Sequence, residues 1–155
     1  MRQFAWFVVV GGMILLLRSS TQTRGIRNNN PMNIREDMRT DYDWIGEAAA
    51  DYDPDFEEFD APEYGIRAGV RILRTYKEKH GLNTISGIIS RWAPETENDT
   101  QSYIKSVSQR LSLDENQQLS VGQYPDLVKA IIYHENGVQP YTDNIIQTGV
   151  NLGLA

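Results

Sequence analysis

The stretch YPDLVKAIIYHENG, from Tyr124 to Gly137, constrains the fold of this chain more than any other segment. Pro125 suits the first turn of a helix, where no backbone N–H is needed, and glycine is the usual residue just past a helix C-terminus. The apolar residues between them recur at helical spacing, which indicates a buried face: Leu127, Val128, Ile131 and Ile132. The segment therefore predicts a core helix that ends at Gly137.

Glu135 lies on the same apolar face, four residues after Ile131. Burying an unpaired carboxylate is costly unless the group takes up a proton. The last turn of a helix also disfavours negative charge, because the helix dipole is negative there. Both effects favour the protonated acid, the form that donates a proton in glycoside cleavage. We therefore predict that Glu135 is a catalytic proton donor; the alternative is a boundary glutamate whose carboxylate reaches solvent.

The composition narrows the class of protein. At 155 residues and 40% hydrophobic, the chain can form one domain with its own core and a short appendage. The absence of cysteine excludes disulfides and thiolate metal sites, and the 2 histidines are far apart, so we predict no metal site and no cofactor. The net charge of −6 argues against a nucleic-acid partner.

Residues 4–17 form an uncharged apolar run. The run is shorter than the roughly 20 residues of a spanning helix, but a helix over residues 1–20 is long enough if its arginines reach outward. Arg18 follows the run directly, without a small-residue cleavage site, which disfavours a cleaved signal peptide, the alternative interpretation. We therefore predict an N-terminal membrane helix over 1–20, with residues 4–17 in the membrane, and one domain over 21–155.

The orientation of this membrane helix stays open. More basic residues follow the run than precede it, which by the positive-inside rule places the domain in the cytoplasm. A peptidoglycan-degrading enzyme must face the periplasm instead. The sequence is thus compatible with a virion membrane, with a host inner membrane and a periplasmic domain, and with a third class, an inner-membrane regulator in the cytoplasm.

Four asparagines gather in the segment RGIRNNNPMNIR: Asn28, Asn29, Asn30 and Asn33. Three consecutive asparagines before a proline are typical of turns and loops. Uncharged amides can bind the hydroxyl and N-acetyl groups of sugars, so we predict that these residues bind substrate. The alternative is that they only satisfy the backbone of the turn.

More than half of the 21 acidic residues lie between residues 36 and 63. Part of this segment resembles a calcium loop, but it lacks the glycine and the final glutamate of such a loop. We therefore predict a small solvated β-hairpin, with short strands over 33–35 and 44–46 and with Phe56 and Phe59 facing inward.

Helices dominate the remainder of the chain. Capping patterns predict helix starts at Asp60 to Glu63, at Thr84, at Asp99 or Thr100, and at Thr142. Together with the Glu135 helix, they predict a mainly α (α+β) domain.

Several motifs resemble those of a phage and prophage family of virion-associated, structural proteins placed in the lysozyme-like superfamily. They are RGIRNNNPMNIR, a Trp-x-Gly, a Phe-x-x-Phe, GIRAGVRIL, TISGIISRWAPETENDTQSYI and IIYHENG, and they span residues 24 to about 150. The resemblance implies a lysozyme-like helical domain with a small β-hairpin, and other virion proteins as partners. Met32 departs from the pattern, because a glycine is expected there.

A more distant similarity links the chain to glucosaminidase and lytic transglycosylase domains. In those domains a catalytic glutamate ends a helix that precedes an asparagine-containing strand. Here the matching helix, IIYHENG, comes at the other end of the chain. We therefore predict a circularly permuted arrangement, in which the C-terminal helix packs beside the N-terminal loop and places Glu135 over the asparagines.

These observations predict a membrane-anchored phage enzyme, a muramidase or lytic transglycosylase that cleaves peptidoglycan glycan strands with Glu135 as its acid. Trp44 and Tyr133 are further predicted substrate-binding residues, and Trp92 is a weaker candidate. A hydrolase needs a second carboxylate, whereas a transglycosylase needs none. The candidates for it are Asp43, Glu47, Glu97 and Asp99, and because none dominates, we favour transglycosylase chemistry. The alternative is a non-catalytic virion structural protein built on the same scaffold.

Overall fold

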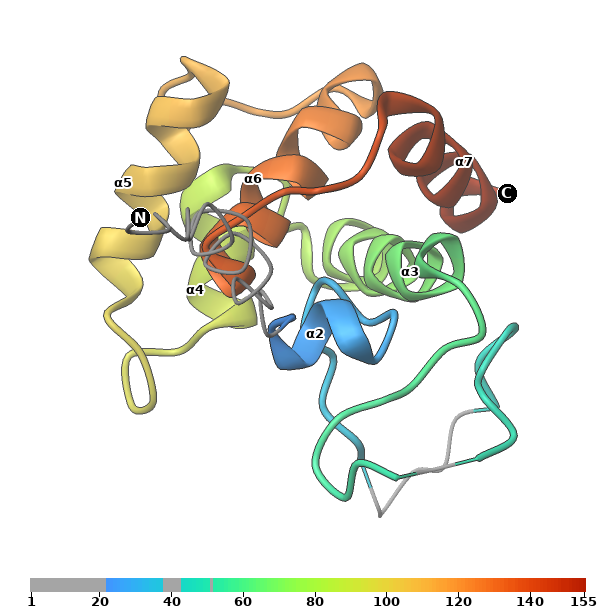
Figure 1. Cartoon of the computed structure of the whole chain (residues 1–155). Coiled ribbons are helices and arrows are strands. Elements are labelled where there is room, and N and C mark those ends of the chain that lie inside the picture. The colour runs from blue at the N-terminus through green and yellow to red at the C-terminus, as the bar shows by residue number, and fades with distance from the viewer. Residues whose placement is uncertain (1–21, 38–42, 51) are drawn as a thin grey trace, which may run out of the picture.

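The computed structural model describes residues 22–37, 43–50 and 52–155. This part of the chain is predominantly helical (Figure 1). Its elements, in chain order, are α2 (Arg24–Arg27), α3 (Pro62–His80), α4 (Ile85–Trp92), α5 (Thr100–Leu111), the 3-10 helix η1 (Val121–Gln123), α6 (Tyr124–Asn136) and α7 (Asp143–Leu154).

The helix boundaries follow the capping residues in the sequence. The Thr84, Asp99 and Thr142 side chains each accept a hydrogen bond from a backbone N–H in the first turn of α4, α5 and α7. Gly81 and Gly137 end α3 and α6 in the left-handed conformation, with φ of 67° and 71°. The predicted helices are therefore confirmed, except that Ala61 rather than Asp60 occupies the N-cap of α3, without a side-chain hydrogen bond.

The core lies around α6, whose apolar face is fully buried as predicted. Leu127, Val128, Ile131 and Ile132 each have 0% exposure. They belong to one cluster with buried residues of α3, α4, α5 and α7. Each such side chain contributes about 1.5–3 kcal/mol through its burial, and α6 packs directly against α2, α5, η1 and α7.

Helices α3 and α7 lie side by side at close range (Figure 1). A Cβ on Gly149 would lie 2.6 Å from Ile66, and a Cβ on Gly153 would lie 2.5 Å from Val70. Such distances are shorter than van der Waals contact, so the close approach requires glycine on this face of α7. The C-terminal helix is thereby fixed along α3.

Met32, which stands where the resemblance led us to expect glycine, is fully buried in the core. Its sulfur occupies the space above Gly69 of α3, where an added Cβ would lie 2.2 Å from Sδ. The larger side chain is thus accommodated by a glycine on the facing helix.

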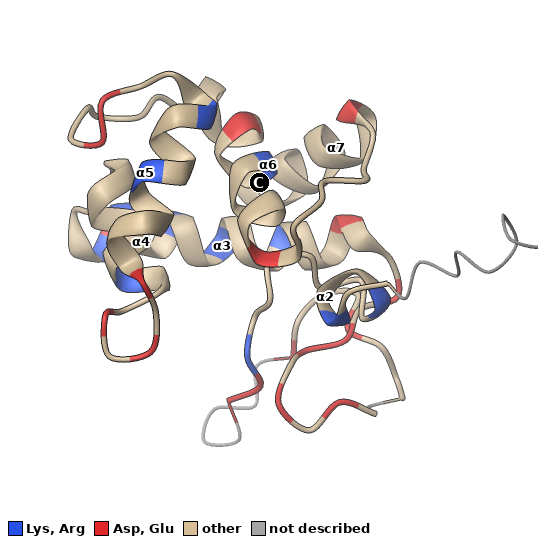
Figure 2. Ribbon diagram, turned by 60° about the vertical axis from the view of Figure 1, so that its left-hand side comes forward, with Lys and Arg blue, Asp and Glu red and all other residues tan. Residues whose placement is uncertain are grey.

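The predicted β-hairpin is wrong. In the described residues the only β-type pairings are isolated bridges, two of which join this region: Arg35 with Phe56, and Glu47 with Phe59. Within the part of the chain that the structure describes, residues 34–36 pair with residues 55–57 through only two backbone hydrogen bonds, from Glu57 to Ile34 and from Glu36 to Asp55, and the Asn30 amide adds contacts to the carbonyls of Ile34 and Glu57 at 2.8 and 2.9 Å. The described part of this segment is an irregular acidic loop (Figure 2), with Phe59 buried and Phe56 half-buried.

The predicted fold class also included an N-terminal membrane helix. Residues 1–20 lie outside the part of the chain that the structure describes. Within residues 22–37, 43–50 and 52–155, no helix has the length and apolar character needed to cross a bilayer. The fold class is therefore corrected to a helical domain with neither a hairpin nor a membrane helix among its described elements.

Candidate functional site

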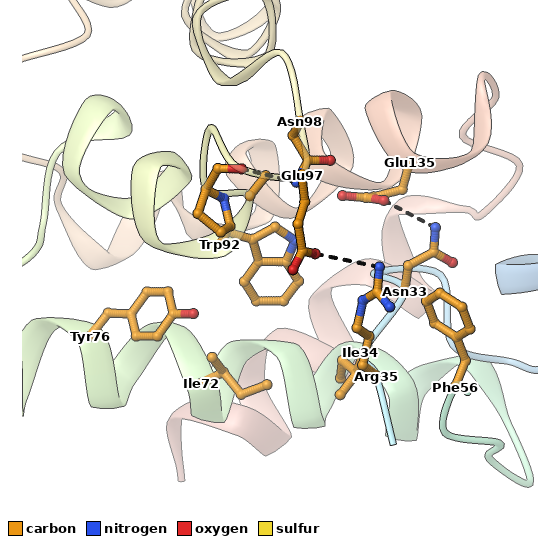
Figure 3. A pocket seen from close by; sticks show the side chains of 12 residues that line it. Asn33, Ile34, Arg35, Phe56, Ile72, Tyr76, Trp92, Glu97, Asn98 and Glu135 are labelled. Carbon is orange, nitrogen blue, oxygen red and sulfur yellow. Dashed lines mark hydrogen bonds and ion pairs between the residues drawn. The ribbon is translucent and has the colours of Figure 1, made fainter. Parts of the chain in front are cut away.

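A cleft of about 340 Å³ opens between the N-terminal loop, α3, the end of α4 and the end of α6 (Figure 3). Glu135 lies on its α6 wall, and Asn33 and Arg35 of the N-terminal loop lie beside it. The remaining lining residues are Ile34, Phe56, Ile72, Tyr76, Trp92, Ala93, Pro94, Glu97 and Asn98. We call this hollow the Glu135 cleft.

Two hydrogen bonds fix the Glu135 carboxyl group. Its Oε1 accepts from the Tyr103 hydroxyl at 2.8 Å, and its Oε2 accepts from the Asn33 amide at 3.0 Å. The residue is half-buried, so the carboxyl group is neither unpaired in the core nor directed into open water. Donors on both oxygens leave the group little freedom to turn, and it is held in place on the wall of the cleft.

Tyr103 and His134 form the support behind this carboxyl group. Burial, and then the nearby Glu135 charge, raise the pKa of Tyr103 far above its ordinary value of 10.0, so its hydroxyl stays protonated and can donate. The His134 ring stacks on Tyr103 with ring centroids 3.5 Å apart. Burial lowers the pKa of His134 below 6.5, against the raising effect of Glu135, so the stacked ring is neutral at pH 7.

Asn33 is the one member of the four asparagines that lines the cleft. It has a left-handed backbone, with φ of 52°, which asparagine tolerates better than most residues. Its side-chain oxygen, Oδ1, lies against Gly25 of α2, where an added Cβ would lie 2.3 Å away. Gly25 therefore leaves the space that lets Asn33 reach Glu135.

The other three asparagines hold the loop together instead of lining the cleft. Asn28 donates to Asp53 at 2.6 Å, Asn29 donates to the Phe59 carbonyl at 2.9 Å, and Asn30 makes the two backbone contacts described above. Asn28 and Asn30 are buried. For these three residues the geometry fits the alternative interpretation, in which asparagines satisfy the turn.

Helix α6 packs beside the N-terminal loop. The Asn136 amide donates to the Pro31 carbonyl at 2.7 Å, and the Thr23 hydroxyl donates to the Asn136 side-chain oxygen at 2.7 Å. With the Asn33–Glu135 contact, these bonds join segments more than 100 residues apart in the chain. The predicted packing of α6 against this loop is confirmed.

An ion pair between the half-exposed Arg24 and the buried Asp53 holds the acidic loop against α2. Both oxygens of Asp53, a residue only 5% exposed, accept hydrogen bonds from the Arg24 guanidinium. These bonds hold the pKa of Asp53 well below its ordinary range. Arg24 also lies over the Phe56 ring, 4.5 Å from its centroid, which positions Phe56 on the cleft wall.

Only one of the four candidates for a second carboxylate lines the cleft. Glu97 lies in the loop after α4, and its Oε2 is 3.6 Å from Nη2 of Arg35, as Figure 3 shows. Asp99 instead caps α5 through Ser102, whose hydrogen bonds lower the pKa of this carboxyl group. Asp43 and Glu47 do not line the cleft.

The predicted aromatic residues are divided between different surfaces. Trp92 lines the Glu135 cleft and meets Tyr76 edge to face, with ring centroids 6.5 Å apart. Trp44 lines a neighbouring hollow, and its indole N–H donates to Glu57 at 3.2 Å. Tyr133 does not line the cleft. Its ring packs against Arg110, whose Cζ lies 3.3 Å from the ring centroid.

Comparison with known proteins relates the whole domain to a phage protein. No model of a known protein family matches the chain. It is, however, 52% identical over 131 residues to Protein P5 of Pseudoalteromonas phage PM2, an alignment that covers 84% of this chain and 82% of that protein. The chain belongs to the family of this phage protein. The predicted relationship to phage proteins is thereby confirmed.

Sequence reasoning missed two residues that shape the site, Tyr103 and Asn136. Tyr103 was expected only as part of the buried face of α5, yet its hydroxyl contacts Glu135. A buried tyrosine needs a partner for its hydroxyl, so its position opposite an inward-facing glutamate was the available signal. Asn136 could have been noticed in the same way, because it is a polar residue in the last turn of a buried helix and its side chain needs hydrogen-bond partners.

Proposed function

We propose that this chain is a virion-associated protein of a phage, and that it has a structural role in the particle together with other virion proteins. The 52% identity to a phage protein is the observation that carries this proposal. The rigid network around Glu135 fits such a role, because it joins α5, α6 and the N-terminal loop through side-chain hydrogen bonds. A lysozyme-like kinship, which the motifs indicate, belongs to the same proposal.

Purified phage particles test the virion assignment. We expect the protein to copurify with infectious particles through a density gradient, in a constant ratio to the major capsid protein, when both are quantified by mass spectrometry. A protein that is abundant in infected cells but absent from the gradient-purified particles would contradict the assignment.

Within this role, we infer that the Glu135 cleft binds glycan strands of the host peptidoglycan. Three features of the lining support this inference: the side-chain amides of Asn33 and Asn98, the exposed Glu97 carboxylate and Arg35 guanidinium at the rim, and the ring of Trp92. Carbohydrate sites combine such polar groups with an aromatic surface on which sugar rings can stack. The proposal needs binding only, and holds whether or not the strand is cut.

Cleavage of the strand is the second candidate function, and the position of Glu135 favours it. A proton passed from Glu135 to the glycosidic oxygen would release the leaving sugar. The positively charged anomeric carbon would then be attacked by a water molecule that Glu97 activates, or by a hydroxyl group of the same sugar, as in a lytic transglycosylase. Glu97 shares the cleft with Glu135, so the hydrolytic route has its second carboxylate available.

Digestion of purified sacculi separates the two candidates. If the protein is a glycosidase, the full-length wild type releases muropeptides, Glu135→Gln does not, and Glu95→Gln, a change of an exposed residue outside the cleft, cleaves normally. Products with anhydro ends would assign the transglycosylase route. Binding without release by the wild type and both variants leaves the structural role and removes the enzyme proposal.

A further inference from the structure

A second hollow, of about 410 Å³, adjoins the Glu135 cleft along α3. The two hollows share three lining residues, Ile34, Arg35 and Ile72, which lie together in Figure 3. Because these residues border both, the hollows are adjacent parts of the same surface. The far part, which we call the α3 hollow, is also lined by Asp37, Trp44, Glu57, Arg71, Thr75 and Lys79.

The α3 wall of this hollow carries positive charge. Arg71, Thr75 and Lys79 follow one another at intervals of four residues, so they lie on one face of the helix. Figure 2 shows basic residues along this helix in a chain whose net charge is negative. Among the residues that the structure describes, no carboxylate forms an ion pair with Arg71 or Lys79, whereas Arg74 on another face of α3 is 3.0 Å from Glu78.

The opposite wall supplies an aromatic surface and two carboxyl groups, Asp37 and Glu57. Glu57 is buried and accepts the indole N–H of Trp44, which fixes the ring at the edge of the hollow. A negative wall facing a positive one orients an anionic ligand with its charged group towards α3. The ring of Trp44 can then support the uncharged body of that ligand.

We propose that the α3 hollow is a subsite for carboxylate groups carried on the glycan strand that occupies the Glu135 cleft, and that Arg71 and Lys79 bind them. The inference rests on the proposed binding of peptidoglycan and goes beyond it by assigning a charge preference. Peptidoglycan strands carry carboxylates on the lactyl groups of alternate sugars, or on the peptides attached there. A neutral polymer such as chitin carries none, so the hollow distinguishes the two kinds of strand.

Binding of three soluble probes to the full-length protein tests this subsite. The probes are peptidoglycan strands with their peptides, the same strands after amidase has exposed the lactyl carboxylates, and chitin oligosaccharides of similar length. The variant is the double substitution Arg71→Gln with Lys79→Gln, and the control is Lys77→Gln, an exposed change on α3 that lines neither hollow. Titration calorimetry at low and high salt gives the affinities.

We expect the wild type and Lys77→Gln to bind the carboxylated strands more tightly than chitin, with a preference that weakens as salt is added. The double variant should lose about three- to thirtyfold of its affinity for carboxylated strands, as expected for two solvent-exposed charge contacts, and should bind chitin as the wild type does. If the wild type still prefers amidase-treated strands to chitin, the subsite binds lactyl carboxylates. If that preference is lost after amidase treatment, the subsite binds peptide carboxylates.

Two results would overturn the subsite while leaving glycan binding intact. One is equal affinity of the wild type for all three probes, and the other is a double variant that loses chitin binding to the same extent. If the wild type binds none of the probes, the proposed binding of peptidoglycan fails, and the subsite fails with it.

Discussion

The two walls of the Glu135 cleft are built in different ways. The α6 wall is the end of a helix whose apolar face is fully buried, so its position follows from hydrophobic packing. The loop wall, which carries Asn33, Arg35 and Phe56, rests on a smaller apolar cluster, whose buried members are Ile34, Phe59 and Ala68. Buried polar groups hold it in addition, above all Asn28, Asn30 and Asp53. One wall is thus stabilised by burial of surface and the other also by directional hydrogen bonds and charge.

This difference means that the walls should respond to different perturbations. Loss of apolar volume should weaken the whole domain, because α6 contacts most of the other helices. Loss of one polar group should release the loop, since each hydrogen bond fixes a particular backbone segment.

Ile131→Ala should destabilise the whole domain by about 2–5 kcal/mol, because it removes a fully buried side chain and leaves a cavity beside α6. Urea denaturation followed by circular dichroism measures the change. Lys105→Ala, an exposed substitution on α5, is the control and should change stability by less than about 0.5 kcal/mol. Equal effects of the two substitutions would contradict the central place of α6.

Gly25→Ala should cost about 1–3 kcal/mol, because the new methyl group would overlap Asn33 and Asn136 at the junction of the two walls. It should also separate Asn33 from Glu135, visible as a shifted Asn33 side-chain amide resonance in NMR spectra. Gly122→Ala is the matched control, since the nearest atom to its added Cβ is 3.8 Å away. An unchanged Asn33 amide resonance in Gly25→Ala would show that the junction accommodates a methyl group, and would contradict the role given to Gly25.

Acid should release the loop wall before the helical wall. Because the folded pKa of Asp53 lies below its ordinary value of 3.8, its contribution to stability is complete above that value and is lost as the pH falls below it. Protection of the loop amides against hydrogen exchange, corrected for the intrinsic exchange rate, should therefore fall more than that of the α6 amides as the pH drops below about 4. Asp53→Asn should show fast loop exchange already above that pH, with a weaker pH dependence, and a loop that stays protected in this variant would refute the role of the ion pair.

Asn33→Gly should have the smallest effect on stability, within about 1.5 kcal/mol, because glycine accepts the left-handed backbone and only one side-chain hydrogen bond is lost. Its effect on the cleft should be larger, since the Glu135 carboxyl group then keeps only the Tyr103 contact. Binding of glycan fragments, measured by calorimetry, should weaken at least tenfold. Unchanged binding together with unchanged stability would remove Asn33 from the site.

The same contrast explains how much of the structure could be predicted from the sequence. Helical periodicity and capping residues are local signals, so the helices and the buried face of α6 were predictable from segments such as Leu127 to Ile132. The loop wall depends on polar contacts between distant residues, which leave no periodic signal. In place of the short strands predicted over 33–35 and 44–46, the structure has isolated bridges that join Arg35 to Phe56 and Glu47 to Phe59.

The candidate site shows the same limit. Glu135 could be singled out because a carboxylate on an apolar face is unusual, and its position beside Asn33 followed from a resemblance between motifs. The roles of Asn28, Asn29 and Asn30 could not be separated from that of Asn33 by sequence, because all four are asparagines of one loop. Their separation depends on Asp53 and on the backbone of residues 57–59, which only the folded chain brings close to them.

Cosedimentation with purified peptidoglycan sacculi tests the central claim most directly. We predict that the full-length wild type and Glu95→Gln sediment with the sacculi, and that the double substitution Asn33→Gly with Glu135→Gln stays in solution although it remains folded by circular dichroism. A wild type that stays in solution, or a double variant that sediments equally well, would contradict the assignment of this cleft to glycan strands.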